Sequence, residues 1–251
     1  MSVEQLLILL PAFFVLAGLY SSVGHAGASG YLAAMALLAI APETMRPTAL
    51  ALNILVASFT TWRFWKAGYF SWRSLWPFLL GSVPLAALGG SLRLTTGLYY
   101  VLAGCALALS AIVLTWRAWG GPPPEAPGEA ARISIVPAVG CGAVIGLLSG
   151  LTGTGGGIFL SPIVLLAGWA GPRHTGGISA PFILTNSSVA LAAGTATWAA
   201  LPAELPWLTV AVLAGAVTGT WLGITRLSTR WLLAAMAVVL SIAAAKLILT
   251  A

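Results

Sequence analysis

The chain has 251 residues, and 59% of them are hydrophobic. Only 6% are charged, whereas charged residues make up about 25% of a soluble domain. A soluble protein of this size could not bury so much apolar surface, so the mean hydropathy of +1.00 excludes an ordinary globular chain and a disordered one. The apolar stretches are long and unbroken, which favours membrane-spanning helices over the alternating strands of a β-barrel.

The net charge of +6 does not indicate nucleic-acid binding, because the basic residues stand singly at the ends of apolar runs. That placement is typical of topology signals at an anionic membrane surface. Cys105 and Cys141 lie far apart in apolar stretches and form no redox or metal motif. We therefore predict an all-α polytopic protein of the lipid bilayer with about eight to ten helical segments. We expect no metal, no cofactor and no nucleic-acid partner.

Both halves of the chain have the same order of elements: an apolar run, a Gly-rich break, a short apolar run and three long spans. In the first half these fall at about 6–22, 23–30 (first break), 31–41, 48–65, 73–92 and 97–117. In the second half they fall at about 133–151, 152–157 (second break), 158–170, 178–199, 205–225 and 231–249. The first run lacks a basic N-terminal region, so we interpret it as a retained span rather than a cleaved signal peptide.

A Pro/Gly-rich stretch at residues 120–132 cannot be helical and separates the two halves. We predict a first half at 1–119, this linker, and a second half at 133–251. At an offset of 128, residues 18–39 match the second half at 8 of 22 positions, and further on the offset grows to 133 and 134. We interpret this similarity as an internal duplication.

The two short apolar runs are too short to cross a membrane. Ten to thirteen helical residues cover about 15–20 Å, against a hydrocarbon core of about 30 Å. We predict that each break turns inside the membrane, so that the hairpin leaves on the side where it entered. Irregular backbone at that depth is tolerated where it lines a cavity or is buried in protein.

A hairpin followed by three crossings reverses the direction of the chain, so the two halves would be inverted repeats. This topology places eight basic residues on the side of the linker and three, Arg46, Arg93 and Lys246, on the other side. The richer side is predicted to be cytoplasmic, which places both termini outside. Inverted repeats with helices broken near the membrane midplane are a recurring architecture of transporters.

The second break contains Thr152, Thr154 and the consecutive glycines Gly155, Gly156 and Gly157, and it opens into a helix. Glycines allow positive φ and leave backbone N–H groups uncovered. The first turn of a helix adds unpaired N–H groups and the positive end of its dipole, which together bind anions. We predict an anion site here, with the threonines as hydroxyl donors. The alternative is that the glycines only allow close helix packing.

The first break contains His25, Gly27 and Ser29 and is expected to present a similar helix start from the opposite face. His25 is the only titratable group that we expect at depth in the membrane, where ionisable residues are functional candidates. A structural role for this histidine is the alternative. His174, in a predicted loop, is expected at the surface.

Asn53 and Asn186 occupy matching positions in the span that follows each hairpin. A buried amide needs hydrogen-bond partners, which are either a ligand or a neighbouring helix. We assign both residues to the anion site together with Ser187, for which helix packing is the alternative.

No carboxylate lies at the centre of a predicted span. The chain has no aspartate, and its glutamates are Glu4, Glu43, Glu125, Glu129 and Glu204. A carboxylate relay for protons or a carboxylate site for cations is therefore not expected, and proton coupling would have to use His25 or the substrate.

Several of these stretches resemble the TauE/SafE family of bacterial sulfite and organosulfonate exporters. The similarity lies in residues 153–162, in the two halves around a linker, and in the Asn after each break. Residues 23–31 and 46–50, followed by Asn53, are similar to one branch of the family. The resemblance covers essentially the whole chain and implies a plasma-membrane carrier for sulfite or a sulfonate.

The first break departs from the family pattern of consecutive glycines followed by proline, because Ala28 and Ser29 stand there. The two breaks can thus contribute unequally, and family membership alone does not fix the substrate. Whether the chain forms a homodimer is left open.

Three other functions are alternatives to an anion carrier. Residues 27–30 match the Gly-x-Ser-Gly pattern of an intramembrane serine hydrolase, but a nucleophilic serine needs a base and His25 is too near in sequence. An ion channel could share the Gly-rich breaks. A metal-cation carrier lacks intramembrane carboxylates, cysteine clusters and methionine rows.

Overall fold

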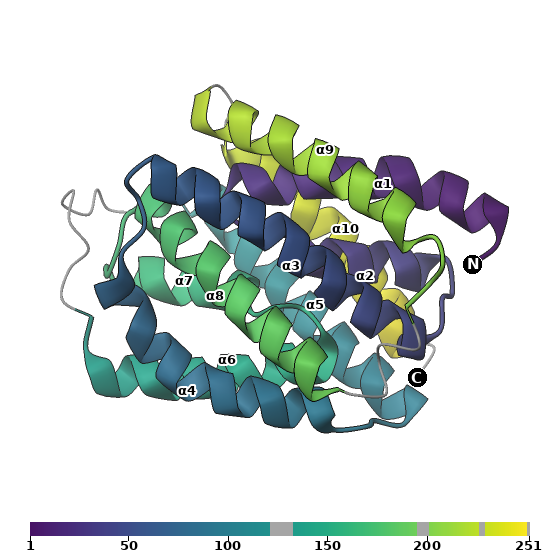
Figure 1. The fold of residues 1–251 in the computed structure, drawn as a ribbon, viewed down its shortest axis with the longest axis horizontal. Helices are drawn as coiled ribbons and strands as arrows, with labels where there is room; N and C mark the ends of the chain where they lie inside the picture. Colours follow the sequence, from purple (N-terminus) through teal and green to yellow (C-terminus); the bar gives the residue numbers. More distant parts are fainter. Residues whose placement is uncertain (121–132, 195–200, 226–228, 250–251) are drawn as a thin grey trace.

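The computed structural model describes residues 1–120, 133–194, 201–225 and 229–249. Within these ranges the chain forms ten α-helices and no strand, which confirms the all-α prediction (Figure 1). Their bounds are α1 (Val3–Ser22), α2 (Ala28–Leu37), α3 (Pro42–Lys66), α4 (Trp72–Ser91), α5 (Thr96–Trp119), α6 (Ile135–Thr152), α7 (Gly157–Leu166), α8 (Pro172–Ala193), α9 (Leu205–Thr225) and α10 (Thr229–Leu249). Apart from Gly120, the predicted linker lies outside the described residues.

Six helices in the described ranges are long and apolar enough to cross a membrane, namely α1, α4, α5, α6, α8 and α9. The chain is therefore a multi-pass membrane protein. By contrast, α2 and α7 have ten residues each, which corresponds to about 15 Å of helix. The two short apolar runs that the sequence predicts are thus short helices.

The predicted starts of two long helices were wrong. Hydropathy placed them at residues 48 and 178, but α3 begins at Pro42 and α8 at Pro172. Each proline lies in the first turn, where its missing N–H costs no hydrogen bond and its fixed φ suits the helix. The residues before each apolar run, several of them polar, thus form the first turns of both helices.

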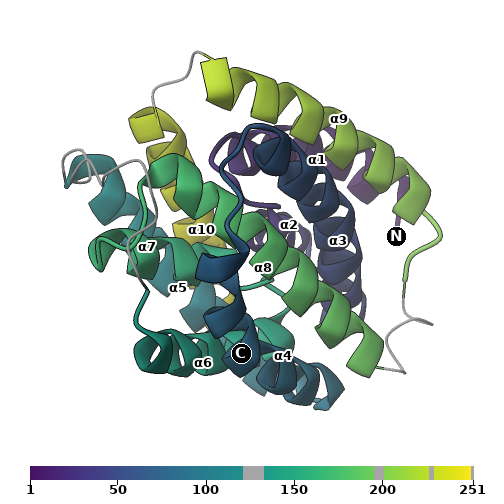
Figure 2. The same cartoon turned by 60° about the vertical axis from the view of Figure 1, so that its left-hand side comes forward.

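Most contacts between a helix of the first half and a helix of the second half have a counterpart, made by the two corresponding helices. Packing of α1 on α9 corresponds to packing of α6 on α4, and both pairs lie side by side in Figures 1 and 2. The α2–α10 contact corresponds to α7–α5, and α3 packs directly on its counterpart α8. Two similar halves would give this pattern. The division into halves and their inversion stay predictions.

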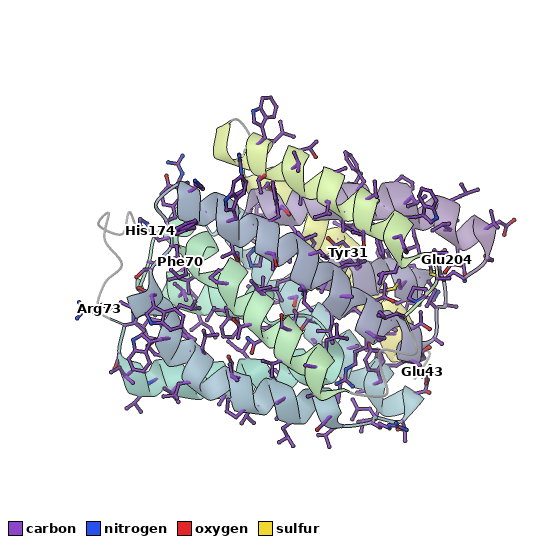
Figure 3. The ribbon with its side chains drawn as sticks, in the orientation of Figure 1. Tyr31, Glu43, Phe70, Arg73, His174 and Glu204 are labelled. Atoms are coloured by element: carbon purple, nitrogen blue, oxygen red, sulfur yellow. The ribbon has the colours of Figure 1, made fainter. Side chains whose placement is uncertain are left out.

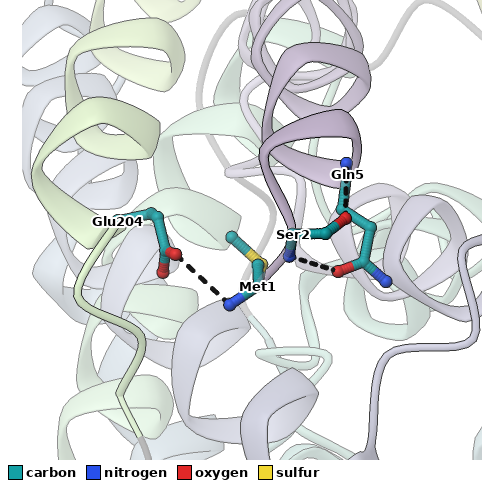
Figure 4. Close-up of polar contacts among 4 residues, drawn as sticks. All are labelled: Met1, Ser2, Gln5 and Glu204. Atoms are coloured by element: carbon teal, nitrogen blue, oxygen red, sulfur yellow. Dashed lines mark hydrogen bonds and ion pairs between the residues drawn. The ribbon is translucent and has the colours of Figure 1, made fainter.

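A capping box and an ion pair fix the start of α1 (Figure 4). Ser2 caps the helix, because its hydroxyl accepts the Gln5 backbone N–H at 3.1 Å while Gln5 Oε1 accepts the Ser2 N–H at 2.9 Å. The Met1 ammonium lies 3.2 Å from Glu204 Oε1, just before α9. Hydrogen bonds from the Glu204 backbone N–H and from this ammonium hold the pKa of the Glu204 carboxyl below its ordinary value.

The first predicted hairpin returns to the end of the molecule where it began. Gln5, in the first turn of α1, donates its side-chain amide to the carbonyl of Leu38, directly after α2, at 3.2 Å. The chain therefore runs along α1, turns at the first break and comes back through α2.

Glycines bring α4 and α6 into backbone contact. A Cβ on Gly142, Gly146 or Gly150 of α6 would collide with the carbonyl oxygen of Phe78, Ser82 or Ala86 of α4, respectively. The three glycines stand four residues apart, so they form one stripe along α6. Small residues in such a stripe allow close helix packing in membranes.

We expect Gly146→Ala to lower the free energy of unfolding by about 1–3 kcal/mol, because the new methyl group forces α4 and α6 apart. Gly140→Ala is the matched control, since nothing lies within 4 Å of a Cβ at Gly140 in the same helix. Alanine favours a helix over glycine, so the control is expected to keep or raise the stability. Thermal unfolding of the purified variants in detergent measures both effects. Equal unfolding temperatures would contradict the packing role of the stripe.

Candidate functional site

The two short helices α2 and α7 begin inside the protein, at the two Gly-rich breaks. Their N-caps are Gly27, with φ of +103°, and Gly156, with φ of +80°, and neither has a side chain that could cap the helix. L-residues rarely adopt this conformation, so glycine is required at both positions. The first N–H groups of each helix are thus left to partners from elsewhere in the fold.

Asn53 of α3 supplies one such partner and connects the two halves. Its Oδ1 accepts the backbone N–H of Ala28, the first residue of α2, at 3.0 Å. Its Nδ2 donates to Ser187 Oγ of α8 at 3.3 Å. The side chain is 1% exposed, and a Cβ on Gly155 would collide with its Nδ2. The first asparagine, Ser187 and the second break are therefore in direct contact.

His25 joins the first break to α7. Its Nε2 lies 3.1 Å from the carbonyl oxygen of Gly157 and 2.9 Å from Ser161 Oγ. Ser161 in turn lies 2.8 Å from Ser179 Oγ of α8. All of these side chains are buried. The structure thus brings together His25 and Gly157, two residues that the sequence predicts for the site and that lie 132 positions apart.

Ser161 and Ser179 were missed in the sequence. Both are single hydroxyls in apolar runs, where a serine usually bonds to its own helix. A usable signal was the position of Ser161, four residues after the start of α7, because residues four apart share one face of a helix.

Ser29 is buried, but the structure gives its hydroxyl a local partner. Ser29 Oγ donates to the phenol oxygen of Tyr20 at 2.9 Å. Nearby, the Tyr31 hydroxyl donates to the carbonyl of Ala26 at 2.7 Å, and its ring fills the space beside Gly27. Ser29 and Gly27 therefore serve the packing of the first break in this structure.

Thr152 and Thr154 at the second break are buried and bond to each other. Their hydroxyl oxygens are 3.1 Å apart, and the Thr152 hydroxyl donates to the carbonyl of Leu148 at 2.7 Å. The Thr154 hydroxyl then donates to Thr152. The Tyr99 hydroxyl donates to the carbonyl of Thr152 at 3.1 Å, which ties α5 to this break.

Asn186 differs from its counterpart Asn53. It is 0% exposed, and neither its Oδ1 nor its Nδ2 has a hydrogen-bond partner in the described part of the chain. The hydroxyl of Ser149, on α6 beside Gly156, is also buried and has no partner among the described residues. Buried polar groups without partners cost about 1–3 kcal/mol each, so they are retained where they serve a purpose. Asn186 has free donor and acceptor capacity for a ligand.

His174 lies outside this cluster, but it belongs to the first turn of α8 rather than to the predicted loop, and it is half-buried. Together with Tyr69, Gly171 and Arg173 it lines an open hollow of about 350 Å³. The Arg173 guanidinium donates to the Tyr69 hydroxyl at 3.2 Å, and the His174 ring meets the Tyr69 ring edge-on. Figure 3 shows His174 with Arg73 and Phe70 at one end of the molecule, and Glu43 and Glu204 at the other.

The buried cluster is rich in neutral hydrogen-bond donors. It offers backbone N–H groups, hydroxyls, amides and one imidazole, whereas the carboxylates of Glu43 and Glu204 lie at one end of the molecule (Figure 3). Within the described residues no three His, Cys, Asp or Glu side chains are grouped as a metal site. Such a donor set suits a ligand that accepts hydrogen bonds, above all a small anion.

The chain is similar to known membrane transporters. The chain is 42% identical over 243 residues to a protein of Sinorhizobium fredii (strain NBRC 101917 / NGR234) named "Probable membrane transporter protein y4hK". The match covers 94% of this chain and 96% of that protein. No solved structure matches the chain. The model of the family described as "Sulfite exporter TauE/SafE" matches residues 9–247, so the chain belongs to this family of membrane transporters.

Proposed function

We propose that the protein is a secondary transporter that exports a small sulfur-containing anion, such as sulfite or an organosulfonate, across the bacterial plasma membrane. The family supports the substrate class, and the donor-rich, carboxylate-poor interior supports an anion. The relative from Sinorhizobium fredii supports transport, since its name says no more than that.

One observation carries the proposal: the two breaks share one polar cluster. His25 of the first break contacts Gly157 and Ser161 of α7, while Asn53 links the start of α2 to Ser187 of α8. A ligand held there would contact both halves at once. Alternating access follows if the halves rock about this point, as in carriers built from inverted repeats.

The proposed site consists of the breaks and the asparagines that follow them. The helix starts supply N–H groups, and the hydroxyls and amides fix the orientation of the anion. His25 is the side chain of the cluster that can become positively charged by binding a proton. The proposed substrate-binding residues are His25, Gly27, Ser29, Asn53, Thr152, Thr154, Gly155, Gly156, Gly157, Asn186 and Ser187.

The orientation in the membrane follows from charge. Arg73 lies at the same end of the molecule as His174 (Figure 3), and Arg173 lines the same hollow as His174. Arg63 and Lys66 lie in the last turn of α3, just before Tyr69 of that hollow. We propose that this end is cytoplasmic. Arg93 and Lys246 belong to the opposite end, where the Lys246 ammonium donates to the carbonyl of Leu37. The chain would then place residues 120–132 in the cytoplasm and both termini outside.

The first experiment is flux of sulfite into proteoliposomes, with and without a pH gradient. We expect saturable flux that sulfate, thiosulfate and small sulfonates inhibit to different degrees. A rate that rises linearly with concentration would favour a channel for small anions, the second candidate. No flux of any sulfur anion through folded protein would contradict the proposed substrate.

In the same assay, we expect His25→Ala to lower kcat/KM by about 10- to 100-fold, because Gly157 and Ser161 lose their shared partner and the ligand loses a donor. His174→Ala is the matched control. It removes the other histidine, at the edge of the outer hollow, and is expected to stay within about twofold of the wild type. Equal flux in both variants would remove His25 from the site.

A further inference from the structure

Arg46 of α3 is a buried cation outside the set of proposed substrate-binding residues. Its side chain is 8% exposed. One terminal nitrogen donates to the carbonyl of Leu92 at 3.0 Å, and the other donates to Gly89 and Gly90 at 2.7 Å each. These carbonyls lie at the C-terminal end of α4. The guanidinium therefore sits against the negative end of that helix dipole.

No carboxylate among the described residues neutralises the charge of Arg46. In the described part of the chain the one ion pair joins Met1 to Glu204, so no described carboxylate lies within ion-pair distance of Arg46. A helix end supplies only about half an elementary charge. A buried charge without a full counter-charge is costly, and in membrane proteins such residues mark ligand or ion paths.

Arg46 Nε is buried, and none of the described residues accepts a hydrogen bond from it. The two terminal nitrogens already donate to Leu92, Gly89 and Gly90, so Nε–H is a donor that remains for a charge-assisted hydrogen bond to an oxyanion. A cation of this kind, nine-tenths buried and with a free donor, is suited to receive an anion.

Arg46 lies directly against the second break. A Cβ on Gly153, whose φ is +83°, would lie 3.1 Å from Arg46 Cγ and 3.3 Å from its carbonyl oxygen. The next residue is Thr154, whose hydroxyl pairs with Thr152, and the Tyr99 hydroxyl bonds to the Thr152 carbonyl. The backbone and the aliphatic part of Arg46 thus pack on this break. Its guanidinium lies at the C-terminal end of α4, where Gly89 approaches Leu151, the residue before Thr152.

We propose that Arg46 is the fixed positive charge of an anion site at the Gly153–Thr154 end of the second break, and that this site takes a compact, doubly charged oxyanion. The inference rests on the proposed function, and it adds a positively charged side chain to the neutral hydrogen-bond donors of the proposed site. Arg46 lies at the end opposite to Arg173 and His174. An anion that passes the cluster around Asn53 would therefore meet Arg46 last, on the proposed external side.

The test compares Arg46→Gln and Arg46→Lys with Arg93→Gln in the same proteoliposome assay and in a thermal-shift assay. Arg93 is exposed and belongs to the same end of the molecule, so Arg93→Gln is the matched control. We expect Arg46→Gln to lower kcat/KM by about 10- to 100-fold, mainly through KM, and Arg46→Lys to retain part of the activity. Arg93→Gln is expected to match the wild type. Added sulfate or sulfite should raise the unfolding temperature of the wild type and of Arg93→Gln, but not that of Arg46→Gln.

A purely structural role for Arg46, as a cap of α4, gives a different result. Arg46→Gln would then unfold at a lower temperature, while the folded fraction would keep the wild-type KM and the same thermal shift with anions. That outcome would overturn the inference. If the wild type transports no sulfur anion, the proposed function fails, and the thermal shift with a panel of mono- and dianions still tests the Arg46 site. Equal shifts in the wild type and Arg46→Gln across that panel would refute it.

Discussion

Gly155→Ala is expected to abolish transport and to destabilise the protein strongly. The backbone of Gly155 has φ of +77°, which costs an L-residue about 1–2 kcal/mol. A Cβ there would also collide with Asn53 Nδ2 and come within 3.1 Å of Ser187 Oγ. Asn53 would have to move, and its bonds to Ala28 and Ser187 would be lost together. We expect the free energy of unfolding to fall by about 2–5 kcal/mol.

Gly168→Ala separates the two causes of that effect. Gly168 has φ of +64°, but nothing lies within 4 Å of a Cβ at this position. The substitution therefore adds backbone strain without a collision, and we expect a loss of about 1 kcal/mol with transport retained. Thermal unfolding and sulfite flux of the two variants measure the difference. Similar behaviour of both would mean that the contact between Gly155 and Asn53 has no role.

Asn53→Asp is expected to stop anion transport while preserving much of the structure. The new carboxylate can still accept the Ala28 N–H, and the positive end of the α2 dipole favours its ionised form. Ser187 can turn its hydroxyl to donate to the carboxylate. An anion in the cluster would then face a like charge in a medium of low dielectric constant, so we expect flux at pH 8 to fall about 100-fold or more.

Asn53→Ala and Ser58→Ala complete this comparison. The alanine at position 53 leaves Ala28 N–H and Ser187 without a partner and should lower stability by about 1–3 kcal/mol. Ser58 lies on an exposed part of the same helix and bonds to the carbonyl of Ile54, so its replacement is expected to change neither property. If Asn53→Asp transports sulfite as the wild type does, Asn53 does not face the anion.

Much of the site is visible in the sequence because glycine, asparagine and histidine are conspicuous in apolar helices. The second break ends where α7 begins, at Gly157, but the first was predicted too long, because α2 already begins at Ala28 and not at residue 31. The positive φ of Gly27, Gly155 and Gly156 explains why glycine stands at these turns. The sequence leaves two roles for the Asn53 amide, a contact to a neighbouring helix and a contact to a ligand. In the structure it makes helix contacts, and a role in binding stays a proposal.

Chain length and apolar content are enough to identify a polytopic helical membrane protein, because they leave no other way to shield so much hydrophobic surface. The sequence also predicts the two short helices, since a run of ten residues cannot cross a bilayer.

Which polar groups meet depends on how the helices pack in three dimensions. Hydropathy describes one helix at a time, whereas the contacts of His25 with Ser161 and of Arg46 with Gly89 and Gly90 depend on how helices from distant parts of the chain pack. The same packing left the amide of Asn186 unpaired although its counterpart Asn53 has two partners. Burial makes each such hydrogen bond energetically significant, and the packing of the helices determines which groups form it.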